Sequence, residues 1–322
     1  MKVLHIGKFF FPSHGGIETF LMDLTQAAHA HGVEQGVIVH AQNKKQGAKH
    51  GNPAAFAHLS HFERVNTLGS LGYAPISPGF PAALNRALSG FSPDLLHLHT
   101  PNPSAFWVLL SSRARRLPWI LHWHADAADP DFAAIVRALY PAYFPFEQAL
   151  LKRAKAVIVS SPPYLDASRA LSRWKSKCHT IPLGMNPERL KERVPAFAAK
   201  TWRDNKALRV LALGRLATYK GFDKLVRAAA RTKARIVIAG DGEDRARLEA
   251  LVSDLKLRDR VHLLGGISDA ERNSLLASCD LVCLPSTNRA EAFGVSVLEG
   301  MALGRPALVS RLNGSGLPWL VV

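Results

Sequence analysis

Short apolar runs alternate with helical patterns along almost the whole chain, in two successive sets. Because such alternation is typical of parallel sheets covered by helices, we predict an α/β fold with two parallel-sheet domains. The first set has strands near 2–7, 36–40, 94–99, 118–123, 155–160 and 178–182, and helices near 16–31, 103–116, 132–153 and 163–173. The second has strands near 208–213, 234–239, 260–264, 280–284 and 306–310, and helices near 221–230, 243–254, 269–278 and 293–303.

Length and composition agree with two domains. The chain has 322 residues, 48% of them hydrophobic, which is enough to bury two sizeable cores. We place the N-terminal domain at 1–190, an interdomain linker at 191–205 within the polar, proline-containing run 186–205, and the C-terminal domain at 206–322. Residues 43–92 are rich in Gly, Pro and Ser, so we expect the least regular structure there, in a region that could adapt to an acceptor or a membrane.

The segment 281–306 contains two carboxylates, eight residues apart, around a strand-to-helix turn. Leu281–Leu284 has the length of a buried strand, Pro285-Ser286 ends it, and a helix follows from about Phe293. The amides of Phe293, Gly294 and Val295 would therefore lie in a first helical turn, where backbone donors favour anions such as a diphosphate. Glu291 and Glu299 on either side could accept hydrogen bonds from sugar hydroxyls. The alternative is that Glu291 is a helix N-terminal charge and Glu299 a solvated residue.

A second segment of this kind begins with the strand 208–213, which ends in Gly214-Arg215 and is followed by Lys220-Gly221 and a helix. Cations just past the carboxyl end of a parallel strand point into the crevice where open α/β sheets bind ligands. Arg215 and Lys220 are therefore candidates to hold a diphosphate. Without the acidic segment, a solvated Arg and Lys would be an equally good interpretation.

Taken together, these motifs resemble the retaining family-4 glycosyltransferases of the GT-B fold. In the C-terminal half the resemblance rests on Gly-Arg-x4-Lys-Gly at 214–221, Gly240-Asp241-Gly242, Pro285-Ser286 and the Glu-x7-Glu pair Glu291 and Glu299. In the N-terminal half it rests on Gly15-Gly16-Ile17-Glu18, His97-Leu98-His99, His122-Trp123-His124-Ala125-Asp126, Val159-Ser160-Ser161 and Ile181-Pro182-Leu183-Gly184-Met185-Asn186. Nearly the whole chain is covered, and the ordered series is more specific than any one motif.

The resemblance implies a GT-B fold of two Rossmann-like domains and transfer of a hexose, of mannose or glucose type, from a nucleotide diphosphate sugar with retention of configuration. It implies no cofactor and no essential metal. Arg215, Lys220 and the amides of Gly15, Gly16, Gly294 and Val295 would stabilise the leaving diphosphate. Glu299 would accept from the ribose, Glu291 from the donor sugar, and the backbone near Ile267 would contact the base, with Gly214 and Phe293 also lining the donor site. His124 would touch the sugar near the reacting carbon, and closure of the two domains would exclude water.

Charge and targeting signals bear on the partners. The net charge of +16 suits a polyanionic partner, either nucleic acid or an anionic membrane surface. Basic residues lie beside the apolar run 106–110, at Arg113, Arg115 and Arg116, and again at Lys44, Lys45 and Lys49. Such a cationic, amphipathic domain resembles family members that act on lipid-linked acceptors, so we expect a lipid-linked or saccharide acceptor, an anionic membrane surface and no nucleic acid. The alternative is that Trp107 and its neighbours pack into the core.

The sequence also limits the compartment. The three cysteines, Cys178, Cys279 and Cys283, predict no disulfide framework. The first apolar run breaks too soon for a signal peptide, and no run approaches the roughly 18 residues of a membrane-spanning helix. We expect a cytoplasmic protein that is either soluble or peripheral at the inner membrane leaflet.

Three other motifs resemble those of proteins with different chemistry, but none is complete or in the expected context. Gly240-Asp241-Gly242 follows a strand, but Arg245 stands where a dinucleotide fingerprint needs its third glycine, which argues against an NAD enzyme. His97 with His99, and His122 with His124, place two imidazoles on one strand face, a metal-ligand spacing that no nearby Glu or Cys completes. Asp129-Pro130-Asp131 reads Asp-x-Asp, but it follows no nucleotide-binding strand and is better explained as a helix cap.

Family members normally continue with a further βα unit and a final helix, whereas this chain stops at Val322 after an apolar segment. We therefore expect a truncated C-terminal domain with exposed apolar surface at Trp319–Val322. Two other functions stay open. One is a sugar-nucleotide 2-epimerase of the same fold, which needs no acceptor; the other is a non-catalytic nucleotide-sugar-binding or nucleic-acid-binding protein that uses the positive charge.

Overall fold

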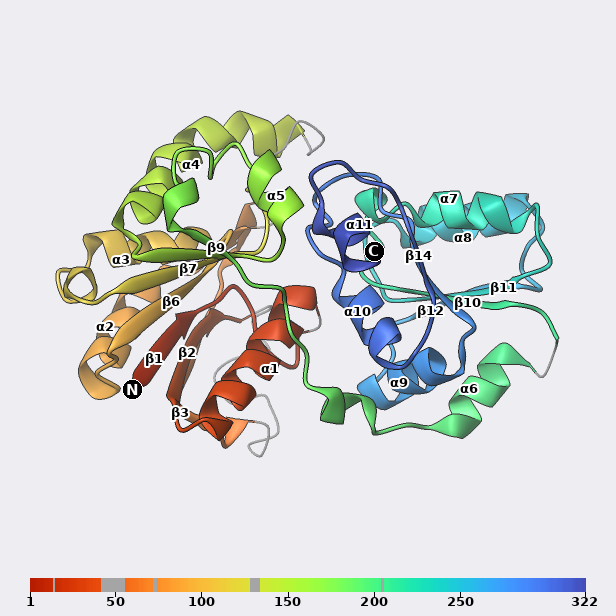
Figure 1. Ribbon diagram of the computed structural model, residues 1–322, viewed down its shortest axis with the longest axis horizontal. Helices are drawn as coiled ribbons and strands as arrows, with labels where there is room; N and C mark the ends of the chain where they lie inside the picture. The colour runs from red at the N-terminus through yellow and green to blue at the C-terminus, as the bar shows by residue number, and fades with distance from the viewer. Residues whose placement is uncertain (14, 42–55, 72–73, 128–133, 204–205) are drawn as a thin grey trace. The chain divides into compact units, whose positions relative to one another are not determined.

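The computed structural model describes residues 1–13, 15–41, 56–71, 74–127, 134–203 and 206–322. The chain forms two compact units, the N-terminal unit Met1–Gly184 and the C-terminal unit Met185–Val322, which are described separately (Figure 1). Each is built on a parallel sheet, as the alternation of strands and helices predicts.

The sheet of the N-terminal unit has seven parallel strands in the order β3-β2-β1-β6-β7-β8-β9. Large buried side chains such as Trp119 and Trp123 fill its core. The strands are β1 (Lys2–Ile6), β2 (Glu34–His40), β3 (Leu59–Val65), β6 (Leu95–Thr100), β7 (Trp119–Trp123), β8 (Ala156–Val159) and β9 (Cys178–Thr180), with β4 (Gly69–Leu71) and β5 (Ala74–Ile76) as a separate antiparallel pair. The helices are α1 (Gly16–Ala30), α2 (Phe80–Gly90), η3 (Pro103–Phe106), α3 (Trp107–Leu110), η4 (Ala114–Arg116), α4 (Ala134–Arg153), α5 (Pro162–Ala167) and η5 (Lys175–Lys177).

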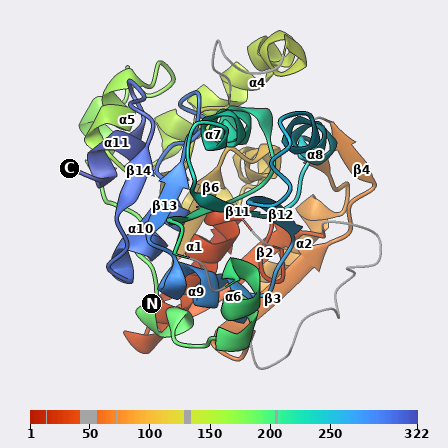
Figure 2. The same cartoon turned by 90° about the vertical axis from the view of Figure 1, so that its right-hand side faces the viewer.

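The sheet of the C-terminal unit has five strands in the order β12-β11-β10-β13-β14. They are β10 (Arg209–Leu213), β11 (Arg235–Ala239), β12 (Val261–Gly265), β13 (Leu281–Leu284) and β14 (Ala307–Val309). The helices are η6 (Pro187–Leu190), α6 (Pro195–Trp202), η7 (Thr218–Lys220), α7 (Phe222–Ala229), α8 (Arg245–Asp254), α9 (Asp269–Ser278), α10 (Val295–Ala302) and α11 (Gly316–Leu320). Helices α7 and α8 pack on one face of the sheet, and α6 and α9 pack on the other (Figure 2).

Each sheet has one point at which the strand order reverses. In the N-terminal unit the chain runs outward from β1 to β3 and then returns to place β6 on the other side of β1. In the C-terminal unit it runs from β10 to β12 and returns to place β13 beside β10. Ligands of open α/β sheets bind at the carboxyl ends of the strands that flank such a reversal. The fold therefore marks the ends of β1 and β6, and of β10 and β13, as candidate sites.

The prediction that 43–92 is the least regular segment is wrong for much of its described part. Strand β3 lies at the edge of the sheet, pairs with β2 and is only partly buried, so its sequence lacks a clear apolar alternation. Helix α2 has a proline at its start and buries Phe80, Ala83, Leu84 and Ala87 along one face. Proline in a first turn is compatible with a helix, and helix α2 was missed because the proline was taken as a sign of irregular structure.

The helix expected over 103–116 is broken into η3, α3 and η4. Ser111 ends α3 with an extended backbone, and its hydroxyl accepts a hydrogen bond from the Ala114 amide. Serine side chains compete with the helix for backbone partners in this way. The helix expected over 163–173 likewise ends at Ala167, followed by Ser168, whose hydroxyl donates to Asp126.

Two further segments contain helices that the sequence analysis did not predict. The stretch 191–205, for which a linker was predicted, contains α6, whose Ala198 and Trp202 are buried against the C-terminal sheet and α9. At the end of the chain, α11 buries Leu317 against Leu284 and Val297, so this part of the apolar segment is covered within the unit. Trp319 and Val322 are exposed.

Candidate functional site

The loops after β10 and β13 bring together two residues that the sequence analysis assigned to the donor site. The Lys220 ammonium group lies 2.5 Å from Oε2 of Glu291, and the Ser286 hydroxyl donates to the same oxygen at 3.1 Å. Both side chains are largely enclosed, with 13% of Lys220 and 10% of Glu291 exposed. A buried ion pair is therefore present where the strand order of the C-terminal sheet reverses.

Local backbone geometry explains how the two loops meet. Gly221 has φ +67°, and a Cβ at this position would collide with the carbonyl oxygen of Pro285. Only glycine combines this left-handed conformation with such a close approach. The Thr287 amide donates to the Tyr219 carbonyl at 2.7 Å, which joins the loops a second time. The glycine of the Lys-Gly motif thus lets the β10 loop rest on the β13 loop.

The charge state of the pair follows from its surroundings. Burial alone lowers the pKa of Lys220, but the Glu291 carboxylate outweighs it and raises that pKa above its ordinary value. Lys220 therefore stays a cation at neutral pH. An enclosed ammonium group can exchange its carboxylate partner for a phosphate oxygen, since both are anionic acceptors.

Arg215 precedes Lys220 by five residues and lies in a more open setting. It follows Gly214 at the end of β10, and its guanidinium lies 3.5 Å from Glu243 with 44% of the side chain exposed. Gly214 itself has φ +145°, and its carbonyl approaches Gly240, so both turns depend on glycine. Arg215 is positioned to reach a ligand at the end of β10, while Lys220 is held within the protein.

Helix α10 begins two residues later than predicted. Its first residue is Val295, and Gly294 precedes it with φ +97°, so Phe293 belongs to the turn and its amide is not in the first helical turn. The amides of Val295 and the next residue occupy that turn. The sequence pattern missed this because Phe293 is buried like a helical core residue.

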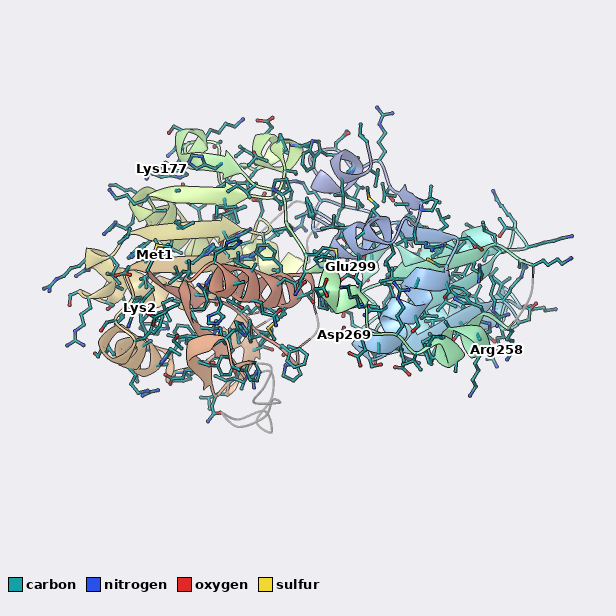
Figure 3. All side chains as sticks on the ribbon, turned by 60° about the horizontal axis from the view of Figure 1, so that its bottom comes forward. Met1, Lys2, Lys177, Arg258, Asp269 and Glu299 are labelled. Carbon is teal, nitrogen blue, oxygen red and sulfur yellow. The ribbon has the colours of Figure 1, made fainter. Side chains whose placement is uncertain are left out.

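Glu299 is almost fully buried on α10 and is engaged by two arginines. Arg189, from η6, donates to Oε1 at 2.8 Å, and Arg272, from α9, lies 3.9 Å from the same oxygen. Figure 3 shows Glu299 and Asp269, the first residue of α9, on neighbouring helices. Glu299 is therefore not a solvated residue, as the alternative interpretation of the sequence had it. Ile267, predicted near the base, is partly buried between β12 and the start of α9.

In the N-terminal unit, Gly15 and Gly16 stand at the start of α1. Gly15 is the N-cap and Gly16 is the first helical residue, so their placement agrees with the predicted glycine-rich loop before a helix. A Cβ at Gly15 would clash with the Glu18 carboxylate. Whether their amides contact a ligand stays a prediction.

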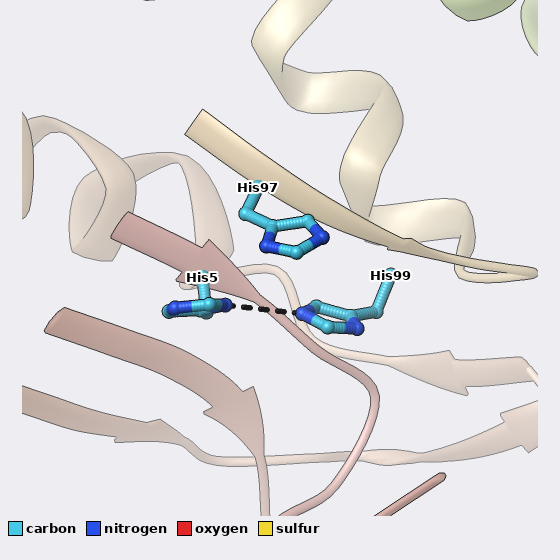
Figure 4. A group of neighbouring side chains, drawn as sticks. All are labelled: His5, His97 and His99. Carbon is cyan, nitrogen blue, oxygen red and sulfur yellow. Dashed lines mark hydrogen bonds between the residues drawn. The ribbon is translucent and has the colours of Figure 1, made fainter. Parts of the chain in front are cut away.

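Five buried imidazoles gather where the order of the N-terminal sheet reverses; this histidine cluster comprises His5, His97, His99, His122 and His124. The strand register explains it, because His5 pairs with His97 and His99 pairs with His122, which places all of them on one face. His5 Nδ1 lies 3.1 Å from His99 Nε2, a contact drawn as a dashed line in Figure 4, and His99 Nδ1 lies 2.9 Å from His124 Nε2. The rings of His122 and His124 stack with centroids 4.3 Å apart.

Burial keeps these rings neutral. It lowers the pKa of His5 to about 4 and that of His124 to about 3, and the pKa values of His97, His99 and His122 also fall well below the ordinary one. Two overlapping triads, His5-His97-His99 and His99-His122-His124, have their nitrogens close enough to share a metal ion. However, both ring nitrogens of His5 and of His99 are already hydrogen-bonded, so an ion in either triad would displace an existing bond.

The loop that carries His124 is anchored by Asp126. Its carboxylate accepts from the Trp123 indole at 2.8 Å and from the Ser168 hydroxyl at 2.6 Å, and its amide donates to the Tyr164 hydroxyl. The His124 amide also donates to the Thr100 carbonyl at 3.0 Å. The His-x-His-x-Asp motif therefore combines ring-bearing residues with the residue that fixes their loop.

Several residues of the site were missed by the sequence analysis. His5 and Gln35 join the cluster only because β2, β1, β6 and β7 are neighbours, an order that one sequence does not reveal. Arg189 and Arg272 reach Glu299 from segments 110 and 27 residues away in the chain. The predicted basic cluster Lys44, Lys45 and Lys49 and the Asp129–Asp131 motif lie outside the described residues.

Two of the three cysteines, Cys279 and Cys283, are buried in the C-terminal unit. All three are free thiols, as the sequence analysis expected. Burial raises the pKa of Cys279 and of Cys283 to about 11. A thiol that stays protonated at neutral pH is a poor nucleophile and a poor metal ligand.

Two family models match the chain. The glycosyl transferase 4-like domain matches residues 15–184, and the glycosyl transferases group 1 model matches residues 195–317. Among curated relatives, the chain is 28% identical to O-antigen chain mannosyltransferase C of Escherichia coli, covering 99% of this chain and 82% of that protein. It is 27% identical to D-rhamnosyltransferase WbpZ of Pseudomonas aeruginosa, covering 99% of this chain and 80% of that protein.

Solved structures share the fold. Anabaena Alr3699/HepE, determined in complex with UDP and glucose, aligns over 98% of this chain and 82% of its own with a TM-score of 0.72 and 21% identity. Sucrose-phosphate synthase from Thermosynechococcus elongatus aligns over 97% of this chain and 82% of its own with a TM-score of 0.75 and 22% identity. With the two family models, these alignments confirm the predicted resemblance: the chain belongs to the family-4 glycosyltransferases of the GT-B fold.

Proposed function

We propose that this protein transfers a hexose, of mannose or glucose type, from a nucleotide diphosphate sugar to a lipid-linked or polysaccharide acceptor. The relatives support a role in surface polysaccharide synthesis, because they include an O-antigen mannosyltransferase, a D-rhamnosyltransferase and a lipopolysaccharide core glycosyltransferase. The complexes of HepE with UDP and UDP-glucose support a nucleotide sugar as donor.

One observation carries the donor site: the enclosed Lys220–Glu291 pair at the reversal of the C-terminal sheet. In this proposal the donor diphosphate accepts from Lys220 and Arg215 and from the amides of Gly294 and Val295. Lys220 then exchanges Glu291 for phosphate, and the released carboxylate accepts from hydroxyls of the donor sugar. Positioned cations stabilise the charge that builds on the leaving diphosphate, which is the main demand of this reaction.

The nucleoside end of the donor is assigned to Glu299 and Ile267. Glu299 is held in place by Arg189 and Arg272, which leaves Oε2 to accept from ribose hydroxyls. The backbone at Ile267 is proposed to contact the base. Gly214 permits the tight turn after β10 that is proposed to bring these groups near the phosphates, and Phe293 is a buried residue of the turn before α10.

We further propose retention of configuration and independence of a metal ion, as in the family that the motifs resemble. Arg215 and Lys220 supply positive charge where a metal would otherwise do so. His124 is proposed to contact the donor sugar, and Gly15 and Gly16 to contribute amides at the start of α1. Retention is tested by the anomeric configuration of the product, and metal independence by turnover in excess chelator.

A lipid-linked acceptor is supported by an apolar and basic surface on α3, η4 and α4, here called the α3–α4 patch. Leu110 is 69% exposed, Phe146 50% and Trp107 38%, and Phe146 stacks on Phe106. Exposed arginines, Arg113, Arg115 and Arg116, follow directly. Aromatic and aliphatic side chains flanked by cations suit an anionic membrane surface. Among the described residues, no helix is both long and apolar enough to cross a membrane.

The donor assignment is tested by a thermal-shift screen of UDP-, GDP- and ADP-sugars, followed by calorimetric titration of the best one. We expect at least one nucleotide sugar to raise the melting temperature of the wild type. Arg215→Ala should lower turnover more than donor affinity, because its interaction strengthens as charge develops. A matched control is Arg258→Ala, an exposed arginine remote from the reversal of the sheet. No response to any nucleotide sugar would refute the proposal.

A further inference from the structure

Four buried side chains form one continuous row of hydrogen bonds in the N-terminal unit; this imidazole chain comprises Gln35, His5, His99 and His124. Gln35 Oε1 lies 2.8 Å from His5 Nε2, His5 Nδ1 lies 3.1 Å from His99 Nε2, and His99 Nδ1 lies 2.9 Å from His124 Nε2. Gln35 is fully buried, His5 and His99 are each 2% exposed, and His124 is 6% exposed. The row runs from β2 across β1 and β6 to the residue that follows β7.

The direction of every hydrogen bond in this row follows from Gln35, its first member. Gln35 Nε2 donates to the Val33 carbonyl at 3.0 Å, and a carbonyl can only accept. The amide oxygen of Gln35 therefore faces His5, and His5 must donate from Nε2. A neutral imidazole carries one N–H, so His5 Nδ1 is an acceptor and takes its bond from His99 Nε2–H.

The same reasoning applies to the next two rings. His99 carries its one N–H at Nε2, so its Nδ1 accepts from His124 Nε2–H. His124 in turn is left with a lone pair at Nδ1. All three rings are neutral at pH 7 because burial lowers their pKa values, so each has a single proton to place.

The end of the row has no protein partner. Within the part of the chain that the structure describes, Nδ1 of His124 is buried and makes no hydrogen bond. Buried polar atoms are almost always satisfied, by protein, water or ligand. His124 directly follows β7, and its amide donates to the carbonyl of Thr100, the last residue of β6. It therefore stands at the carboxyl ends of the strands, beside the reversal of the sheet where ligands bind.

We propose that Gln35, His5 and His99 are positioning residues that hold His124 in its Nε2–H tautomer, so that Nδ1 accepts a hydrogen bond from a hydroxyl group of the bound sugar. The identity of the hydroxyl rests on the proposed function; the tautomer does not. The arrangement gives His124 a fixed role as acceptor. It neither donates a proton nor offers a positive charge to the ligand, so discrimination favours a substrate that carries a hydroxyl at that position over a deoxy analogue.

The tautomer is measured by two-bond ¹H–¹⁵N correlation on the full chain with labelled histidine, with His124 assigned from a His124→Gln variant. In the wild type we expect His5, His99 and His124 all to be protonated at Nε2. Gln35→Leu removes the acceptor that orients the row, so a population of His124 protonated at Nδ1 should appear. Gln35→Glu keeps an acceptor facing His5, so it should preserve the wild-type tautomer.

Two further readouts separate this proposal from the proposed function. Saturation with a nucleotide sugar should move the His124 Nδ1 resonance upfield, and Gln35→Leu should lower kcat/KM about tenfold, as expected for one lost hydrogen bond, whereas Gln35→Glu should retain most of the activity. A wild-type His124 protonated at Nδ1, or at both nitrogens, would overturn the proposal even if Gln35→Leu fails to fold. So would an unmoved resonance with bound donor. If no nucleotide sugar binds, only the assignment of the hydroxyl falls with the proposed function, and the tautomer result still decides the positioning role.

Discussion

Arg189 and Glu299 are 110 residues apart in the chain and meet at 2.8 Å in a nearly enclosed ion pair. Only 17% of the arginine side chain and 5% of the glutamate side chain are exposed. Arg272 adds a second positive charge at 3.9 Å from the same oxygen. The carboxylate assigned to ribose recognition is therefore pre-oriented by two cations, and its removal affects both binding and stability.

Replacing Glu299 by Gln should weaken binding of the nucleotide by about 1.5–3 kcal/mol, the range for a hydrogen bond to a charged group. Arg189→Met is the matched variant, because it removes the same ion pair but leaves the carboxylate to accept from ribose. We expect Arg189→Met to lose stability yet keep most of its nucleotide affinity. Calorimetric titration with UDP and GDP distinguishes the nucleotide affinities of the two variants. Unchanged affinity in a folded Glu299→Gln protein would remove Glu299 from the site.

Lys220→Met should destabilise the C-terminal unit by about 3–5 kcal/mol, because it strands the Glu291 carboxylate in an enclosed position. The double variant Lys220→Met/Glu291→Leu should lose less than the sum of the two single changes. Lys191 is the control: it also lies 2.5 Å from a carboxylate, that of Glu188, but both side chains are exposed. Lys191→Met should change stability by no more than about 0.5 kcal/mol in urea denaturation. Equal effects at the two lysines would contradict the burial argument.

The fold was predictable from the sequence because strand and helix periodicities are local. The two parallel sheets and most of their strands agree with the expected ranges, and so do α7, α8 and α9. Edge strand β3 and helix α6 were missed, because the first is half-exposed and the second begins with a proline in a polar run. Neither has the pattern of a fully buried element.

The candidate site was predictable where it consists of loop motifs, and not where it depends on strand order. Lys220 and Glu291 were both singled out, but their mutual ion pair depends on the contact between two loops at Gly221. The histidine pairs on β6 and at the end of β7 were visible as alternating residues. Their connection to His5 and Gln35 required the neighbours β1 and β2, which pair through contacts distant in sequence.

The buried histidines make the N-terminal unit sensitive to acid. Their pKa values are lowered in the folded protein, to about 4 for His5 and for His40 and about 3 for His124, so between pH 6.5 and 4 the unfolded chain binds more protons than the folded one. The contribution of these histidines to the free energy of unfolding is then fully present above pH 6.5. It falls as the pH drops, by up to about 1.4 kcal/mol per pH unit for each such residue.

Urea denaturation at pH 7, 6 and 5, followed by tryptophan fluorescence, measures this loss; Trp119 and Trp123 are the buried tryptophans of the N-terminal unit. His40→Gln should reduce the loss of unfolding free energy per pH unit by the contribution of one histidine. The exposed residue His31 gives the control, since His31→Gln should leave that loss unchanged. Constant stability from pH 7 to pH 5 would contradict the neutral, buried state of the cluster.

The α3–α4 patch predicts binding to anionic lipid. Vesicles of phosphatidylglycerol and phosphatidylcholine should retain the protein in a sedimentation assay, and vesicles of phosphatidylcholine alone should retain much less. Arg116→Glu combined with Leu110→Ser should weaken this binding, by about 1 kcal/mol for each basic residue lost near the surface. Arg258→Glu changes charge equally in the C-terminal unit and should have a smaller effect. Equal retention by both kinds of vesicle would exclude an electrostatic contribution.

The most direct test of the proposed function is product analysis with the best donor from the binding screen. The protein is incubated with that nucleotide sugar, with or without a lipid-linked saccharide extract, and both the released nucleoside diphosphate and the sugar product are measured. We predict release that depends on the acceptor and a new glycosidic bond with the anomeric configuration of the donor. Conversion of the donor to a 2-epimer without any acceptor, or binding with no turnover under either condition, would contradict the assignment as a sugar-transferring enzyme.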